Sequence, residues 1–441
     1  MRFVRLLLLL TPVLVEAQSP GHVHTAKLDN GMNILVQEDH SIPTVALYLF
    51  YKVGSRDERP GITGISHFFE HMMFNGSSKF GPGEFDRLME ENGGNNNAYT
   101  TKDVTVYTDW FPPTALNLMM DMESDRMAHL TLNSKTIESE RGVVYSERRL
   151  RVDNDNFGAL SEQVTATAIM AHPYHWPVVG WPSDIEAWTR QDLEAYYQQG
   201  YAPNNSLMVV VGDVDPNTVF DLAKKYFASI PSHPTFSEPR TKEPPQEGER
   251  IVKLKREAEL PLLLLAFHMP PSHDKDNPAI QVAETILSAG DSSRLHSCLV
   301  DKEQAALNVQ AFDEPSLDSY LLGIYAQPRA GVSAERVKSL VFDELNKLIS
   351  KPVSGAELRK AKNQWLAAHY RSMTTVSGRA NLLGTYQIFY GSFDRLFTEP
   401  ERIEAVAAAD VQRVAQNLFR PENCTTGILE PQKLPPPEAK K

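Results

Sequence analysis

The feature that most constrains how this chain can fold is a pattern of strand, helix and turn residues that occurs twice. The apolar segment Val45–Tyr51 has a counterpart at Leu260–Phe267, and both read as buried strands. A helical segment that leads to Gly76 corresponds to one that leads to Gly290, an offset of 214 residues (290 − 76). Three later residues recur at an offset of 218: Asp192, Pro203 and Asn205 match Asp410, Pro421 and Asn423. These near-equal offsets favour a duplicated α+β unit of about 200 residues, with chance coincidence as the alternative.

A proline-rich stretch without a hydrophobic period separates the two copies, at residues 231–249, and reads as a linker. We therefore predict an N-terminal domain over residues 18–230, a homologous C-terminal domain over 250–432 and a tail over 433–441. Hydrophobic periodicity and turn residues predict the elements of the first domain. These are strands over 25–36 (with an Asn30-Gly31 hairpin turn), 45–51, 97–100, 104–108 and 206–211, and helices over 83–91, 114–128 and 216–228.

One helical segment of the first copy, Gly64–Phe74, carries a compact set of polar residues. His67 and His71 lie four residues apart and project from one face, with Glu70 beside them. Two imidazoles at this spacing can hold one Zn²⁺, and the carboxylate is placed to take a proton from a metal-activated water. The alternative is that two histidines fell close together by chance. The H-x-x-E-H order of the motif nevertheless favours a metal site.

A third metal ligand is expected downstream, because a catalytic zinc usually has three protein ligands. Asn133 offers an N-cap for a long helix from Lys135 to about Val152. This helix carries Glu140 and Glu147 two turns apart on one face. Taken alone, they are better explained by a solvated acidic surface, but the histidine motif upstream reverses that preference.

The motif and its spacing resemble the inverted-zincin metallopeptidases, a family that includes pitrilysin, insulysin and the β subunit of mitochondrial processing peptidase. The resemblance rests on His67-x-x-Glu70-His71 followed by Glu140 and Glu147, the last 76 residues after His71 (147 − 71). Three further stretches also match, so that the resemblance covers nearly the whole mature chain. They are 93–100, 172–181 and 201–213.

The resemblance implies a fold and a set of residue roles. The fold is that of a LuxS/processing-peptidase-like metallohydrolase, with two homologous α+β domains. Each domain is an antiparallel-rich sheet with helices packed on it, and the two enclose a clam-shell chamber. One zinc ion per chain would be held by His67, His71 and Glu147, with Glu70 as general base and Glu140 as a catalytic residue that orients a ligand. The second copy has Gln281 and Thr285 in place of the two histidines, so it is predicted to bind no zinc.

The function implied by the resemblance is zinc-dependent endopeptidase activity on peptides or unfolded segments. The substrate would lie as an added strand along the edge that carries Asn97, Ala98 and Tyr99, bound mainly through its backbone. An ordinary core strand is the alternative for that stretch. The rival for the whole chain is a non-catalytic binding or assembly subunit of the same fold.

The second copy departs from the family in one place. Relatives carry an Arg and a Tyr, seven residues apart, that reach the substrate carbonyl near the zinc, whereas this chain has Val300 and Leu307. Arg379 and Tyr386 have the right spacing but lie in a different element, and we interpret them as structural. We therefore expect a heterodimer with a homologous subunit that supplies the Arg and Tyr, although a homodimer is possible.

The first residues have the form of a secretory signal. A short basic start precedes the apolar run Leu6–Val15, and Val15-Glu16-Ala17 resembles a small-residue cleavage site. The apolar run is too short to cross a membrane. We therefore expect a signal peptide over residues 1–17, cleavage near Ala17 and an exported protein, periplasmic in a Gram-negative bacterium.

Charge and cysteine content limit the remaining function classes. The formal net charge of −12 argues against nucleic acid and gives no sign of a basic membrane patch. The two cysteines, Cys298 and Cys424, could pair in an oxidising compartment or remain as buried thiols, and their number decides neither.

Overall fold

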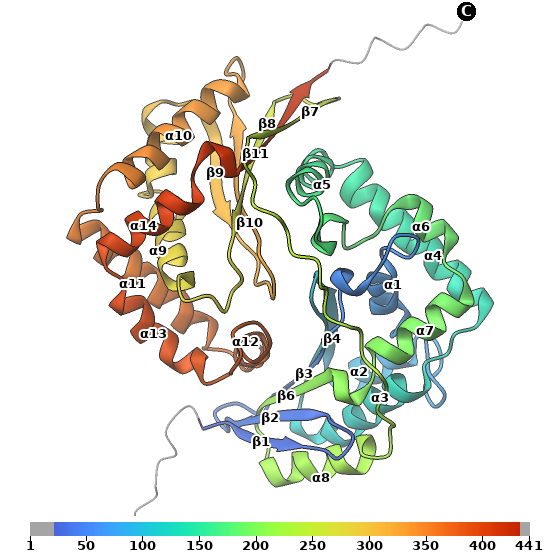
Figure 1. Ribbon diagram of the computed structural model, residues 1–441. Helices are drawn as coiled ribbons and strands as arrows, with labels where there is room; N and C mark the ends of the chain where they lie inside the picture. The colour runs from blue at the N-terminus through green and yellow to red at the C-terminus, as the bar shows by residue number, and fades with distance from the viewer. Residues whose placement is uncertain (1–21, 433–441) are drawn as a thin grey trace, which may run out of the picture.

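The computed structural model describes residues 22–432, which form two halves that face each other (Figure 1). The predicted signal peptide, residues 1–17, and the predicted tail, residues 433–441, lie outside the described residues. The first half is built on a six-stranded sheet of order β1-β2-β6-β3-β5-β4. Its strands are β1 (His24–Lys27), β2 (Asn33–Glu38), β3 (Val45–Tyr51), β4 (Asn95–Thr100), β5 (Thr105–Phe111) and β6 (Ser206–Gly212).

The second half repeats this sheet without the first strand. Its order is β7-β11-β8-β10-β9, with β7 (Arg250–Arg256), β8 (Leu262–Met269), β9 (Ala306–Phe312), β10 (Tyr320–Pro328) and β11 (Cys424–Pro431). In both sheets one pair is parallel, β2 with β6 and β7 with β11, and the other pairs are antiparallel. The predicted α+β fold with two homologous, antiparallel-rich domains is therefore confirmed.

Helices accompany both sheets. The first half has α1 (Ile65–Met72), α2 (Glu84–Glu91), α3 (Leu116–His129), α4 (Ser134–Arg148), α5 (Asn156–Ala168), α6 (Pro182–Ala187), α7 (Arg190–Gly200) and α8 (Pro216–Phe227). The second half has α9 (Asn277–Ser288), α10 (Ala334–Ser350), α11 (Gly355–Ser372), α12 (Val376–Phe389), α13 (Arg395–Ala405) and α14 (Ala408–Leu418). Short 3₁₀ or π turns complete them, at η1 (Ser55–Asp57), η2 (Pro113–Ala115), η3 (Arg149–Asp153), η4 (Pro173–His175), η5 (Pro203–Asn205), η6 (His296–Lys302) and η7 (Pro421–Asn423).

Equivalent asparagines show the duplication at atomic detail. Asn205 Nδ2 donates hydrogen bonds to the carbonyls of Lys52 and Gly200, at 3.0 and 2.9 Å. In the second half, Asn423 Nδ2 donates to the carbonyls of His268 and Leu418 at the same two distances. Each side chain thus satisfies one carbonyl at the end of the central strand, β3 or β8, and one at the end of the preceding helix, α7 or α14. The offset of 218 seen in the sequence therefore marks one structural device used twice.

The two halves exchange helices across their interface. Helix α5 of the first half packs on strands β7, β8 and β11 of the second sheet, and α12 of the second half packs on β3 and β6 of the first. The α12 contact buries Leu383 and Ala380 against Phe50, Val209 and other apolar side chains. Because each half covers a sheet face of the other, separation would expose both apolar cores to water.

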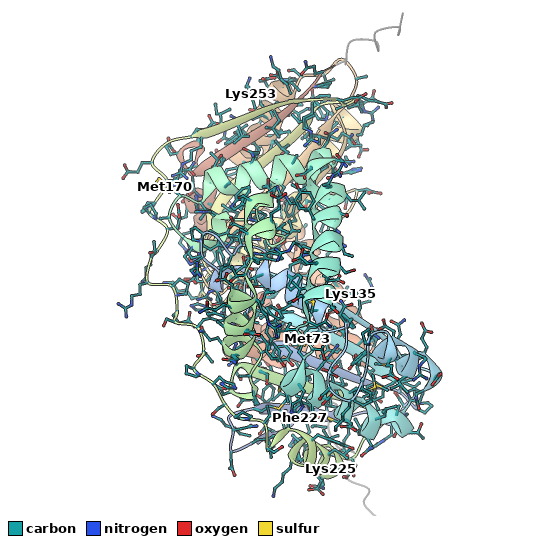
Figure 2. All side chains as sticks on the ribbon, turned by 90° about the vertical axis from the view of Figure 1, so that its right-hand side faces the viewer. Met73, Lys135, Met170, Lys225, Phe227 and Lys253 are labelled. Carbon is teal, nitrogen blue, oxygen red and sulfur yellow. The ribbon has the colours of Figure 1, made fainter. Side chains whose placement is uncertain are left out.

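The predicted linker has neither helix nor strand, but polar contacts hold it along its length. Its Glu243 accepts hydrogen bonds from the amides of Met170, Ala171 and His172 at 2.8–3.0 Å. Gln246 Nε2 donates to the carbonyl of Cys424 at 2.8 Å. In the side view, the exposed side chain of Met170 lies at the margin of the molecule (Figure 2). The linker therefore follows a fixed course across both halves.

The structure also shows the state of the two cysteines and the character of the helices. Cys298 and Cys424 are both free, so the thiol alternative is the one the structure shows. Within residues 22–432, no helix has the length and apolar content needed to cross a membrane.

Candidate metal centre

Helix α1 carries the histidine motif, and two glycines set its position. Gly64 precedes the helix with φ of +85°, a left-handed conformation that L side chains rarely adopt. A Cβ at Gly64 would lie 2.4 Å from the carbonyl oxygen of Val179, and one at Gly180 would lie 2.4 Å from that of Thr63. The segment 172–181, which matched the family in sequence, therefore packs backbone to backbone against the start of the motif helix.

The structure brings His67, His71 and Glu147 together. One ligand atom from each residue lies within 4.8 Å of the others, and among the described residues no other group of three His, Cys, Asp or Glu does so. The Nε2 atoms of His67 and His71 lie 3.6 and 3.1 Å from Glu147 Oε2. These side chains come from α1 and α4, two helices that pack against each other.

Side-chain contacts fix both glutamates of α4 beside the histidine motif. Glu140 Oε1 lies 2.8 Å from His71 Nδ1, and its other oxygen accepts a 2.8 Å hydrogen bond from Asn75 Nδ2. Since a carboxylate can only accept, His71 Nδ1 carries a proton toward Glu140, and Nε2 is the atom of the ring that would bind a metal once its own proton is released. Arg151 Nε lies 2.9 Å from Glu147 Oε1 and leaves Oε2 for the histidines.

Glu70 lies on the same helix face and is fixed from the neighbouring strand. Its Oε2 accepts a 2.6 Å hydrogen bond from Thr100 Oγ1 at the end of β4. Sequence reasoning missed this threonine and Asn75, because no motif spacing points to a side chain that acts through another. It also missed Arg151, although the spacing of four residues from Glu147 was a signal for an ion pair. The signal for Thr100 was its position at the end of the stretch 93–100.

The electrostatics of the site differ from one residue to the next. Burial lowers the pKa of His67 to about 4, which favours the neutral imidazole. Burial opposes charge on His71 as well, but hydrogen bonds to Glu140 and Glu147 outweigh it and raise the pKa to about 9. The hydrogen bond from His71 lowers the pKa of Glu147 to about 2, and burial raises that of Glu70.

The donor set fits a zinc ion. Neutral imidazole and ionised carboxylate are the forms that ligate metals. The Nδ1 atom of His67 is buried and has no hydrogen-bond partner among the described residues, while its Nε2 faces Glu147. Three donors in one cluster also leave room for a further ligand.

The stretch Asn97, Ala98 and Tyr99 lies in β4, which is the last strand of its sheet and pairs only with β5. The edge is thus open to an added strand near the metal centre. The side chain of Asn97 is exposed, whereas Tyr99 OH donates a 2.9 Å hydrogen bond to Asn381 of α12. Tyr99 therefore points toward the second half.

A cavity of about 790 Å³ adjoins the site and is lined by both halves. Arg151, which contacts Glu147, lies in its wall together with Trp176 of the first half and Leu264 and Tyr320 of the second. A space of this volume could hold several side chains of an extended peptide.

None of the four residues considered for the Arg and Tyr roles belongs to the metal cluster. Val300 packs partly on the second core, and Leu307 is exposed on β9. Tyr386 of α12 is buried in the apolar cluster that α12 forms with the first sheet. Arg379 of the same helix forms an ion pair with Asp39. Both residues of α12 thus have structural contacts at the interface of the halves.

Comparisons with known proteins show the family of this chain. Residues 33–180 match the family model described as insulinase (peptidase family M16), and residues 187–365 match the model described as peptidase M16 inactive domain. A relative in Helicobacter pylori named zinc protease PqqE is 31% identical over 95% of each chain.

Solved structures give the same result for the fold. The crystal structure of a protease from Helicobacter pylori has a TM-score of 0.90 and 30% identity, over 93% of this chain and 99% of that one. The periplasmic protease PqqL from Escherichia coli has a TM-score of 0.77 and 20% identity; 93% of this chain matches 48% of that protein. At this identity the second likeness concerns the fold alone.

Proposed function

Because the chain belongs to the M16 family of peptidases, we propose that it is a zinc-dependent endopeptidase that hydrolyses peptides or unfolded segments. The observation that carries this proposal is the convergence of His67, His71 and Glu147, with Glu70 fixed beside them by Thr100. In the proposal the first three residues hold one zinc ion, and Glu140 orients His71 through Nδ1.

A bound zinc ion would activate a water molecule and polarise the substrate carbonyl. Glu70 accepts the proton of that water at a carboxylate oxygen and returns it to the leaving amine. Thr100 donates to Glu70 Oε2 and leaves Oε1 for this transfer. No side chain is acylated in such a reaction.

The substrate backbone pairs with the free edge of β4, at Asn97, Ala98 and Tyr99. Recognition then depends on main-chain hydrogen bonds, since the Tyr99 hydroxyl is already bonded to Asn381. The cavity between the halves admits chain segments in extended form, which favours peptides over folded proteins.

A partner of the same fold completes the site in this proposal. Val300 and Leu307 cannot donate hydrogen bonds, and loss of one donor to the developing oxyanion costs about 10²–10³ in rate. A heterodimer with a homologous subunit supplies the missing Arg and Tyr, and a homodimer is the alternative assembly. Export through the predicted signal peptide, residues 1–17, places the enzyme in the periplasm or outside the cell in this proposal.

A non-catalytic binding subunit is the second candidate function. The missing donors favour it, as does the match of residues 187–365 to a model described as an inactive domain. The complete set of His67, Glu70, His71 and Glu147 in the first half favours the peptidase.

The test is hydrolysis of a quenched-fluorescent peptide library by the mature chain, alone and with a candidate partner. Activity that requires the partner and disappears in Glu70→Gln supports the proposal in full. Full activity of the chain alone supports the peptidase activity but contradicts the need for a partner subunit. Absence of hydrolysis in both states, with zinc bound, favours the binding subunit.

A further inference from the structure

The turn that joins β4 to β5, residues 101–104, is held by the second half of the molecule. Lys102 Nζ lies 3.3 Å from Glu314 Oε2 and 4.3 Å from the ring centre of Tyr320. Asp103 Oδ2 accepts a 3.3 Å hydrogen bond from the amide of Leu317. These contacts join residues more than 200 positions apart.

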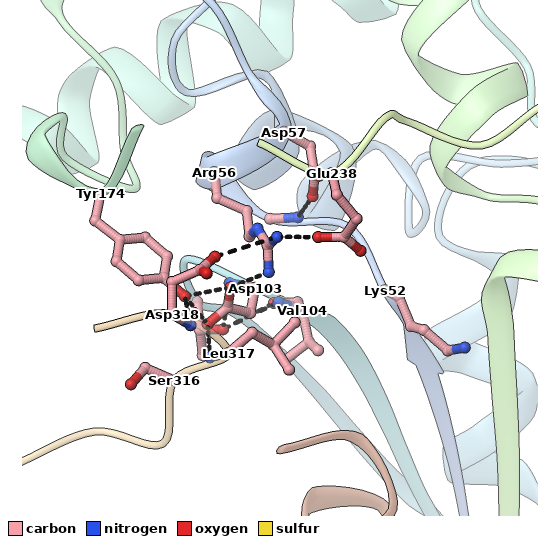
Figure 3. A network of polar contacts seen from close by, with 12 residues as sticks. Lys52, Arg56, Asp57, Asp103, Val104, Tyr174, Glu238, Ser316, Leu317 and Asp318 are labelled. Carbon is pink, nitrogen blue, oxygen red and sulfur yellow. Dashed lines mark hydrogen bonds and ion pairs between the residues drawn. The ribbon is translucent and has the colours of Figure 1, made fainter. Parts of the chain in front are cut away.

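A buried arginine links the same turn to the second half (Figure 3). The side chain of Arg56 is 4% exposed and lies 3.2 Å from Asp103 Oδ1 and 3.3 Å from Asp318 Oδ2. It also forms an ion pair with Glu238 of the linker. Tyr174 OH lies 2.7 Å from both oxygens of Asp103 and accepts a 3.2 Å hydrogen bond from the amide of Asp318.

The backbone around Arg56 follows the turn closely. Its amide donates to the carbonyl of Lys102 at 2.9 Å. A Cβ at Gly54 would lie 2.5 Å from that same carbonyl oxygen, so only glycine allows this approach. A displacement of Arg56 therefore displaces the turn as well.

The turn follows directly after Thr100, the threonine that holds Glu70. Thr100 ends β4, is paired with Thr105 across the hairpin and donates to Glu70 Oε2 at 2.6 Å. As an edge strand, β4 has a sheet neighbour on one side only. On its open side it has no further strand, so the turn adds to the support that β5, helices α1 and α2 and the Tyr99–Asn381 hydrogen bond give to its position.

Association of the halves does not require these charges. Helices α5 and α12 already bury two apolar interfaces between the halves. Burial of charged groups is costly, and replacing a buried ion pair by apolar residues is often neutral or stabilising. A role in fixing geometry explains the network better than a role in adhesion.

We propose that Arg56, Asp103 and Asp318 are positioning residues through which the second half holds β4, and with it Thr100 and Glu70, in the geometry for catalysis. This inference rests on the proposed function for the meaning of that geometry, but the contacts themselves predict how β4 behaves. The second half, which has no histidine pair, thereby contributes to the site of the first.

The test removes the half-exposed carboxylate of Asp318 in the second half. It then measures the amide hydrogen exchange of strand β4 in the first half. Asp318→Asn deletes the charge that faces Arg56 and His172, and Glu314→Gln removes the partner of Lys102 as a second variant. Glu335→Gln is the control, because its ion pair with Lys253 lies within the second half. Amide hydrogen exchange over residues 95–104 is measured by mass spectrometry on metal-free protein, and peptide hydrolysis is measured on the zinc form.

Asp318→Asn is expected to raise amide exchange over 95–104 about tenfold, while β3 and β6 keep the wild-type rate. In the zinc form, kcat falls about tenfold or more with little change in KM, since a small misplacement of a catalytic group is costly. Asp318→Glu restores both values. Unchanged exchange in folded Asp318→Asn and Glu314→Gln overturns the inference, whether or not the wild type hydrolyses peptides; a wild type without hydrolysis overturns only the proposed function.

Discussion

At the scale of single residues, the site depends on polar contacts that orient the side chains proposed to bind the metal. Glu140 fixes the proton of His71 on Nδ1, and Arg151 engages the outer oxygen of Glu147. The identities of His67, Glu70 and His71 were predictable because they lie within one helical turn and a half. Asn75 and Thr100 were not, since their contacts depend on how α1, β4 and α4 pack, whereas Arg151 lies four residues after Glu147, a spacing that the sequence shows.

Loss of Glu140 should weaken metal binding. Glu140→Ala leaves the imidazole of His71 without its Nδ1 partner, and removal of such partners typically lowers metal affinity about 10–100-fold. Zinc competition with a chromophoric chelator measures the change. Glu138→Ala is the matched control, because Glu138 lies on the same helix with its side chain 70% exposed. Equal affinity of the two variants would show that Glu140 does not orient the ligand.

The second copy retains a carboxylate at the position of Glu70 (70 + 214 = 284). Burial, followed by repulsion from Asp313, raises the pKa of Glu284 to about 8. The folded state therefore keeps a proton that the unfolded chain releases near pH 4.5, so the free energy of unfolding should fall between about pH 4.5 and 8.

Glu284→Gln should remove this pH dependence. At pH 8 we expect the variant to be more stable than the wild type by roughly 1–3 kcal/mol, with the difference vanishing near pH 4.5. Urea unfolding at several pH values measures it, with Glu335→Gln as an exposed control. A parallel pH profile for Glu284→Gln and the wild type would contradict the burial argument.

At the scale of elements, local patterns predicted the strands and helices around the motif. Strand β3 begins and ends where its apolar run does, and α4 begins after Asn133, whose side chain accepts from the amide of Thr136. Strand β5 continues to Phe111, beyond the predicted end at residue 108. Pairing with β3 over its full length explains the extension, which the polar Asp109 concealed in the sequence.

The contact between Gly64 and Gly180 should tolerate no side chain. Gly64→Ala combines a left-handed φ with a backbone clash, and we expect a loss of roughly 2–4 kcal/mol in the free energy of unfolding. Gly83 has a φ of +75° before α2 but open space around it, so Gly83→Ala should cost about 1 kcal/mol. Denaturant titration of both variants checks the difference, and equal losses would show that the close approach is unimportant.

At the scale of the whole molecule, the duplication was predictable but the exchange of helices was not. Gly384 of α12 lies against Phe50 of β3, and Gly427 of β11 lies against Val164 of α5. Pairs so distant in sequence leave no local pattern. For the same reason the linker was predicted as a connection, without the polar contacts that fix it.

Cutting the linker should leave the halves together. A protease site inserted at the exposed residues Thr241 and Lys242 allows cleavage without loss of α5 or α12. We expect the two fragments to co-elute on gel filtration, because each covers a sheet face of the other. Leu383→Asp places a charge in one of these interfaces and should release the fragments. Separation of the cleaved wild type would contradict the helix-exchange account.

The central claim is that one zinc ion, held by the first half alone, supports peptide hydrolysis through Glu70. The most direct measurement is a titration of metal-free protein, with its partner present, in which bound zinc and peptide hydrolysis are recorded together. The account predicts that wild-type activity rises to a plateau at one zinc per chain, and that Glu70→Gln binds one zinc without hydrolysis. Activity in Glu70→Gln, or a plateau at two zinc ions per chain, would contradict it.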